Sequence, residues 1–118
     1  MEELRTNSQL LPTARKQGDA ILLALRGEID LHNSPQIRTV VLDLIQKHKP
    51  LRIVFNVDGV AYMDSSGIAV LVEALKKLKP TGGKIYLTNV QPRVRGLLEI
   101  ARLDTVFNLV STEEEALK

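Results

Sequence analysis

Residues 51–79, LRIVFNVDGVAYMDSSGIAVLVEALKKLK, contain both kinds of secondary structure that decide the fold. Residues 51–57 place apolar, mostly β-branched or aromatic side chains at every second position, which predicts a strand. Asp58-Gly59 predicts a turn, and residues 60–63 are apolar again. The period then changes, and apolar residues follow one helix face at Ile68, Leu71, Val72, Leu75 and Leu78.

The predicted helix has clear signals at its end. Lys76, Lys77 and Lys79 complement the negative end of the helix dipole, Pro80 cannot continue the helix, and Gly82-Gly83 supply a turn.

The start of this helix, Asp64-Ser65-Ser66-Gly67, is the one candidate site of chemistry in the chain. Asp64 or a serine can cap the helix by accepting from free N–H groups of the first turn. Alternatively, one hydroxyl accepts a phosphoryl group, which the helix N-terminus would tolerate. Spacing alone favours the cap, because such caps are common.

Length and composition exclude several classes of protein. A chain of 118 residues with 44% hydrophobic and 25% charged residues predicts one folded domain over 1–118, with polar residues 1–8 expected to be flexible. The net charge is only +2 and aromatic residues make up 3%, so we expect no direct nucleic-acid binding and an aliphatic core.

The sequence also lacks cysteine, a membrane-spanning segment and a secretory signal. The chain has no cysteine, which excludes disulfides, thiolate catalysis and cysteine-bound zinc. Its longest apolar run, Ala20 to Leu25, is too short to cross a membrane, and Met1-Glu2-Glu3 is no secretory signal. We therefore expect a cytoplasmic protein with no membrane association, no metal site and no cofactor.

The remaining segments alternate between strand and helix patterns. Pro12 restricts Gln9 to Arg15 to an edge strand, the turn Lys16-Gln17-Gly18-Asp19 follows, and Ala20 to Arg26 is apolar on both faces, as in a central strand. A loop from Gly27 to Asn33 leads to a helix capped by Ser34 before Pro35. This helix ends near Lys47-His48-Lys49-Pro50.

The last third of the chain continues this alternation. Lys84 to Val90 is predicted to be a strand, and Gln91-Pro92 starts a helix. Thr105 to Val110 is predicted to be a last strand, followed by a short helix with a capping box at Ser111 or Thr112. Val94, Leu97, Leu98 and Ala101 are expected to face inward.

Together these elements predict an α/β fold: a mixed sheet with a parallel core, helices packed on it and an N-terminal antiparallel edge strand. Sites in such sheets lie beyond the carboxyl ends of the strands. We therefore expect the loop Gly27–Asp30 to lie beside the loop Asp58–Ser66.

Three other functions, namely hydrolysis by a serine nucleophile, nucleotide binding and metal binding, find only weak support in the sequence. His32 could serve as a base for Ser65 with Asp30 as its orienting group, but no nucleophile elbow surrounds the serine. Gly82-Gly83 follows a helix and lacks the spacing of a phosphate-binding loop. The carboxylates Glu28, Asp30, Asp58 and Asp64 could bind a metal, but loop and cap roles in solvent explain them better.

The pattern resembles the STAS domain, in particular the small single-domain anti-sigma-factor antagonists of bacteria. The resemblance covers nearly the whole chain, and its most specific part is the block from Ile53 to Gly67 between a strand and a helix. The other matching segments are Gly27-Glu28-Ile29-Asp30, Gly82-Gly83 before a strand, and Val106-Phe107.

The resemblance implies a switch rather than an enzyme. In that family, the unmodified antagonist binds an anti-sigma factor that is also a serine kinase, and so frees a sigma factor. The kinase phosphorylates the serine after the aspartate of the motif, here Ser65, and a serine phosphatase resets it. Asp64 is then expected to cap the helix or orient the neighbouring hydroxyl, Gly67 to keep the approach open, Asp30 to contact the partner or organise the site, and Ser66 to be a second, unmodified hydroxyl.

A second reading remains open: a STAS subunit without a phosphoswitch in a lipid- or anion-transport complex or a stressosome. Departures from the family pattern are mild. Ile68-Ala69 stands where Leu-Gly is frequent, and Asn56 stands where Asp is common. Neither change removes the expected switch.

Overall fold

The computed structural model describes residues 2–4 and 9–118, and its described strands form one six-stranded sheet in the order β1-β2-β3-β4-β5-β6. β1 with β2 and β2 with β3 pair antiparallel, whereas β3-β4, β4-β5 and β5-β6 are parallel. This confirms the predicted mixed sheet with a parallel core. The strands are β1 (Glu2–Glu3), β2 (Thr13–Gln17), β3 (Ala20–Ile29), β4 (Arg52–Met63), β5 (Lys84–Thr88) and β6 (Asn108–Val110).

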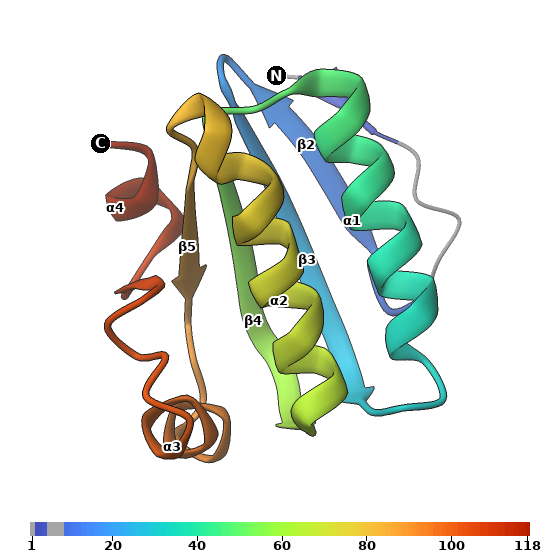
Figure 1. Ribbon diagram of the computed structural model, residues 1–118, viewed down its shortest axis with the longest axis vertical. Helices are drawn as coiled ribbons and strands as arrows, with labels where there is room; N and C mark the ends of the chain where they lie inside the picture. The colour runs from blue at the N-terminus through green and yellow to red at the C-terminus, as the bar shows by residue number, and fades with distance from the viewer. Residues whose placement is uncertain (1, 5–8) are drawn as a thin grey trace.

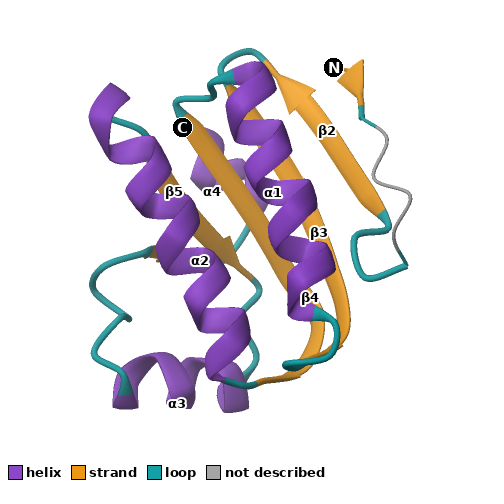
Figure 2. Ribbon diagram, turned by 45° about the vertical axis from the view of Figure 1, so that its right-hand side comes forward, coloured by secondary structure: helices purple, strands orange, loops and turns teal. Residues whose placement is uncertain are grey.

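The helices cover the sheet unevenly. Two long helices, α1 (Ser34–His48) and α2 (Ser65–Leu78), lie side by side on one face, as Figure 1 shows. A 3-10 turn, η1 (Lys79–Thr81), follows α2, and α3 (Pro92–Ile100) lies beyond the carboxyl ends of the parallel strands β4 and β5. The short C-terminal helix α4 (Glu113–Leu117) lies behind the sheet (Figure 2) and packs Ala116 with Val54 and Leu22.

The main core lies between the sheet and helices α1 and α2. Because successive side chains of a strand point to opposite faces, every second residue of the central strands meets the helices. Almost all of these side chains are aliphatic, as the sequence predicted. The core includes Ile21, Leu23, Ile53, Phe55, Ile85 and Leu87 from the strands and Ile37, Val41, Leu71, Ala74 and Leu78 from the helices.

The predicted turn at Asp58-Gly59 is wrong, because β4 continues through it to Met63. β3 also extends past Gly27 to Ile29 and gives this part of β4 a parallel partner. The pairing is irregular here, with register shifts between Ala24 and Arg26 and again before Glu28. The glycine thus marks an irregularity in a continuous strand, a role that glycine often has within strands.

Other differences concern element boundaries. The strand predicted at the edge from Gln9 to Arg15 is β2, which starts only after Pro12 and runs two residues beyond Arg15. It pairs with β1 as well as β3, so β1 and not β2 lies at the edge. Only the last three residues of the strand expected from Thr105 to Val110 are paired, and Ala101, expected to face inward, is exposed at the end of α3.

Capping and terminal residues complete the comparison with the sequence. Asn33, not Ser34, precedes the first residue of α1, whereas Thr112 caps α4 as one of the two predicted boxes requires. Of residues 1–8, Glu2 and Glu3 form β1; the flexibility expected of residues 1 and 5–8 concerns residues outside the described part. Within residues 2–4 and 9–118, every helix is too short or too polar to cross a membrane.

Candidate functional site

Asp64 organises the start of α2. It has an extended backbone at the N-cap, and its Oδ1 accepts a hydrogen bond of 2.8 Å from the backbone N–H of Ser66. Its other carboxylate oxygen, Oδ2, accepts from the backbone N–H of Leu31 at 3.2 Å. The backbone N–H of Asp64 in turn donates to the carbonyl of Ile29. One aspartate therefore caps the helix and joins it to the loop after β3.

These contacts keep Asp64 ionised. The hydroxyl of Ser66 donates to the same carboxylate and is the main reason that the pKa of Asp64 lies below its usual value. Burial acts in the opposite direction as the second-largest effect, and the backbone N–H groups of Ser66, Gly67 and Leu31 each lower this pKa further. Hydrogen bonds to a carboxylate favour its charged form. The site therefore contains a fixed negative charge next to Ser65.

The two adjacent hydroxyls have different environments. Ser66 is half-buried and its hydroxyl is bound to Asp64. Ser65 is exposed, and its hydroxyl makes no hydrogen bond to any residue in the described part of the chain. Ser65 is thus the hydroxyl that an external enzyme can reach, whereas Ser66 belongs to the capping arrangement.

Gly67 faces the interior rather than the surface. It is buried, and a Cβ on it would lie 2.5 Å from Cγ of Met63 and 2.9 Å from Cγ2 of Ile29. Both distances are too short for real contacts. The absence of a side chain therefore lets the first turn of α2 pack closely against the ends of β3 and β4. The role expected of Gly67, keeping the approach to the serine open, stays a prediction beside this packing role.

Asp30 organises the loop between β3 and α1. Its Oδ1 accepts from the backbone N–H groups of His32 at 2.9 Å and Asn33 at 3.2 Å. Asn33 returns the contact, because its Oδ1 accepts from the backbone N–H of Asp30 at 2.9 Å. This reciprocal turn places Leu31 where its N–H reaches Asp64. The two predicted loops are therefore neighbours, as expected, although much of each is paired strand.

The sequence analysis missed four residues near this helix start. Asn33 was treated as loop, but it stabilises the turn that holds Leu31. Leu31 and Tyr62 are exposed apolar side chains, at 75% and 38%, on the two segments that flank the helix start. Arg93 of α3 lies 5.7 Å from the centre of the Tyr62 ring. Leucine in a polar loop was the one available signal, since the strand irregularity that places Tyr62 is not visible in sequence.

The alternative chemistries gain no support from the geometry. The Asp30 carboxylate binds backbone N–H groups, and no hydrogen bond from the imidazole of His32 occurs in the described part. His48 lies at the far end of α1. Across residues 2–4 and 9–118, no group of three or more potential ligands is arranged to hold a metal ion.

The sequence is similar to a known protein family and to several of its members. The STAS domain profile matches residues 12–116. The chain is 30% identical over 97 residues to the anti-sigma F factor antagonist of Paenibacillus polymyxa, covering 82% of this chain and 83% of that protein. It is 32% identical over 94 residues to the anti-sigma-B factor antagonist of Bacillus subtilis, covering 80% and 84%.

Solved structures agree with the sequence comparison. The anti-sigma factor antagonist SpoIIAA in its unphosphorylated form has a TM-score of 0.78 and 28% identity, with 88% of this chain and 90% of that chain covered. The Bacillus cell fate determinant SpoIIAA in its phosphorylated form has a TM-score of 0.70 and 27% identity, with 88% and 94% covered. With the profile match over most of its length, this chain belongs to the STAS domain family.

Proposed function

We propose that this protein is an anti-sigma-factor antagonist whose binding to an anti-sigma factor is switched off by phosphorylation of Ser65. One observation carries the proposal: two adjacent serines differ, because Ser66 donates its hydroxyl to Asp64 while Ser65 is exposed with its hydroxyl unbound within the described residues. Its similarity to anti-sigma factor antagonists, and to SpoIIAA in a phosphorylated form, supports the proposal.

The partners that complete the switch are a serine kinase and a serine phosphatase. We propose that the kinase is the anti-sigma factor itself, as the family resemblance implies. The protein would be the substrate of both activities and have no turnover of its own. Asp64 and Ser66 would hold the helix start in place, and Asp30 would fix the neighbouring loop.

Phosphorylation is expected to change the surface without unfolding the helix. A phosphoryl group adds about −1.5 to −2 charges, and at the first turn of α2 the helix dipole favours them. The ionised Asp64 carboxylate lies beside it, so the negative charge is concentrated there. Between Leu31 and Tyr62, that charge would oppose desolvation of the surface on which a partner binds. Release then requires no conformational change.

Binding calorimetry with the anti-sigma factor, recovered from host extract with the wild-type protein as bait, tests this account. Ser65→Ala should bind like the wild type, and Ser65→Asp should bind at least about tenfold more weakly, because like-charge repulsion at an interface costs several kcal/mol. Ser111→Asp is the matched control, since Ser111 is exposed just before α4 and gains the same charge. Equal affinity of Ser65→Asp and wild type would contradict the electrostatic switch.

Pull-downs from host extract with wild type and Ser65→Asp as baits separate this function from a STAS subunit without a switch. If transport or lipid-trafficking subunits are captured equally by wild type and Ser65→Asp, and the wild type gains no mass with Mg²⁺ and ATP, the protein is a structural subunit and Ser65 only begins a helix.

A further inference from the structure

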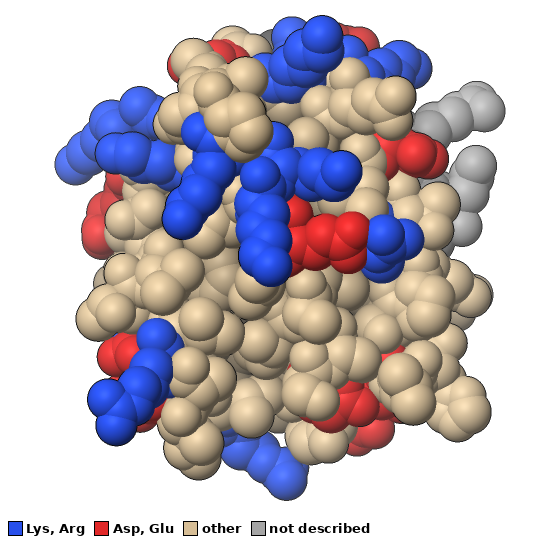
Figure 3. Space-filling view, in the orientation of Figure 1, with Lys and Arg blue, Asp and Glu red and all other residues tan. Residues whose placement is uncertain are grey.

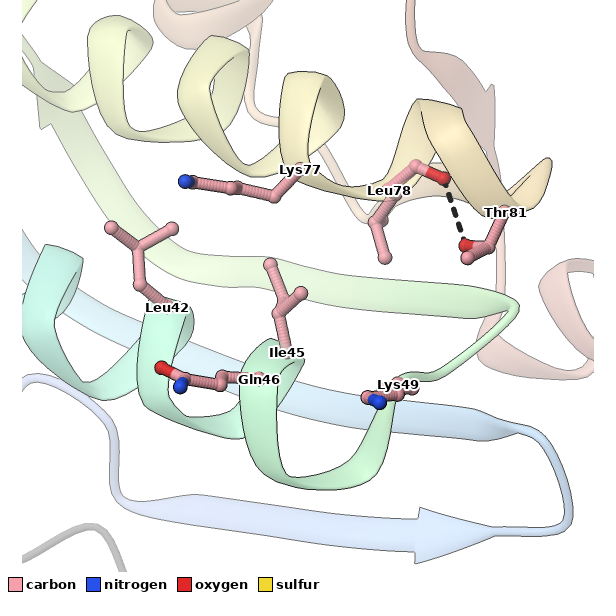
Figure 4. Close-up of a pocket in the computed structure, with 7 residues that line it drawn as sticks. All are labelled: Leu42, Ile45, Gln46, Lys49, Lys77, Leu78 and Thr81. Carbon is pink, nitrogen blue, oxygen red and sulfur yellow. Dashed lines mark hydrogen bonds between the residues drawn. The ribbon is translucent and has the colours of Figure 1, made fainter.

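An apolar groove lies between helices α1 and α2 at the end opposite Ser65. Leu42, Ile45 and Leu78 direct their side chains into the space between the two helices (Figure 4). The cavity volume is about 450 Å³, within the range of small-molecule sites. Ile45 and Leu78 are nearly fully buried at 7% and 1%, so they form a floor rather than a mobile surface.

The groove has a defined beginning along the helices. Nearer their N-termini, the guanidinium of Arg38 donates two hydrogen bonds, of 2.6 and 2.7 Å, to the carboxylate of Glu73 and ties α1 to α2. All lining residues come later in each helix than this pair. The hydroxyl of Thr81, at the far end, is already bound to the carbonyl of Leu78. Thr81 therefore offers no free hydroxyl to the groove, and the amide of Gln46 is the other neutral polar group that lines it.

Cationic side chains surround this groove. Lys49 and Lys77 line it directly from the two helices. Further lysines occupy the same end of the molecule, and Figure 3 shows basic side chains gathered over the upper part of this face, where α1 and α2 end. They are Lys47 in α1, Lys76 in α2, Lys79 in η1 and Lys84 at the start of β5. The net charge of the whole chain is only +2, so positive charge is concentrated at this end of the molecule.

Lys49 occupies a backbone position that favours glycine. It ends α1 with φ 44° and ψ 56°, and its N–H donates to the carbonyl of Ile45. Left-handed C-terminal positions of helices are usually glycine, since other residues are strained there. The chain thus places a lysine at the lip of the groove where a glycine would stabilise the fold.

From these observations we propose that the groove binds an amphiphilic anion with a single alkyl chain and a carboxylate head, of the free fatty-acid type. The chain would lie on Leu42, Ile45 and Leu78, and the carboxylate would pair with Lys49 or Lys77. The other lysines would raise the local concentration of anions. This site is independent of Ser65, which begins the opposite end of α2.

Titration calorimetry with sodium decanoate on the full chain tests the proposal. Decanoate should bind more tightly than octanoate, by about fourfold for each methylene group, because alkyl burial stabilises the complex. Decanol, which has no charge, should bind more weakly than decanoate. Added salt should weaken decanoate and leave decanol nearly unchanged.

Three variants locate the site. Lys49→Gly should weaken decanoate binding about threefold, as expected for loss of one exposed ion pair, yet raise the urea midpoint, because glycine relieves the left-handed strain. Leu42→Trp should fill the groove and abolish binding. Arg95→Gln, an exposed residue of α3 that lies away from the groove, also removes one positive charge and should bind like the wild type, and circular dichroism checks that each variant is folded.

Several outcomes would overturn the proposal: no heat with wild type, equal affinity for decanol and decanoate, or unchanged binding by Leu42→Trp. Vesicles of phosphatidylglycerol separate the sources of the ligand. Vesicle binding that is stronger than decanoate binding and insensitive to Leu42→Trp would assign the lysines to a membrane surface instead, and the free carboxylate would be rejected.

Discussion

Helices α1 and α2 cross the sheet in the same direction, but their two ends are stabilised in different ways. At the N-terminal end, the carboxylates of Asp30 and Asp64 bind backbone N–H groups and Gly67 allows close packing, so the exposed hydroxyl of Ser65 sits on a rigid base. At the C-terminal end, buried Ile45 and Leu78 carry the packing and lysines surround them.

The difference separates two kinds of function in one small domain. Directional hydrogen bonds fix the position of a single group, which a modification site requires. An apolar floor with charges at its edge does not fix the position of a single group, but it suits a ligand that binds through its apolar surface area and its charge. If this comparison is right, substitutions at the two ends should affect different properties.

The largest effect is expected at the floor of the groove. Leu78→Ala should reduce the free energy of unfolding by about 2–5 kcal/mol, since a fully buried leucine leaves a cavity. Leu42→Ala, at the half-buried lip, should cost clearly less. Urea denaturation followed by circular dichroism measures both. Similar losses for the two variants would mean that the lip is as much a part of the core as the floor.

A somewhat smaller effect is expected at the serine end. Gly67→Ala should reduce the free energy of unfolding by about 1–3 kcal/mol, because its Cβ overlaps with Met63 and Ile29. The matched control is Gly96→Ala in α3, where a Cβ has open space. That change should stabilise the protein by about 0.5–1 kcal/mol through helix propensity. Destabilisation by both substitutions to the same extent would remove the packing argument for Gly67.

The smallest effect is expected in the dependence of stability on pH, through Asp64. The pKa of Asp64 is lowered in the folded protein, so its contribution to stability is complete above the usual value of 3.8 and is lost as the pH falls through the lowered value. Asp64→Asn should therefore show a flatter decline of urea midpoint between neutral and acidic pH. Asp43→Asn, an exposed residue of α1, is the control and should decline like the wild type. Identical profiles for all three proteins would contradict the assigned role of Asp64.

Much of this arrangement could be predicted from the sequence. The change of period after Met63, the capping residues before Ser66 and the order of strands and helices depend on local patterns, and the structure confirms them. The neighbouring loops followed from the rule that parallel strands end at one edge. The family resemblance added the role of Ser65, which remains a proposal.

Long-range contacts explain what the sequence did not indicate. Asp58-Gly59 has the sequence of a turn, but in the structure the second half of β3 pairs with this part of β4 and keeps it a strand. The packing role of Gly67 depends on Ile29, from a different strand. The groove needs the relative placement of two helices, and each of its lysines alone looked like an ordinary helix end. Local sequence patterns do not show contacts between segments that are far apart in the chain.

The central claim is that Ser65, and not Ser66, receives the phosphoryl group. The most direct measurement is intact mass and site mapping of the protein recovered from host extract with Mg²⁺ and ATP, using wild type, Ser65→Ala and Ser66→Ala as baits. The account predicts that wild type and Ser66→Ala each gain one phosphoryl group on Ser65, and that Ser65→Ala gains none. Stoichiometric phosphorylation of Ser65→Ala would contradict it.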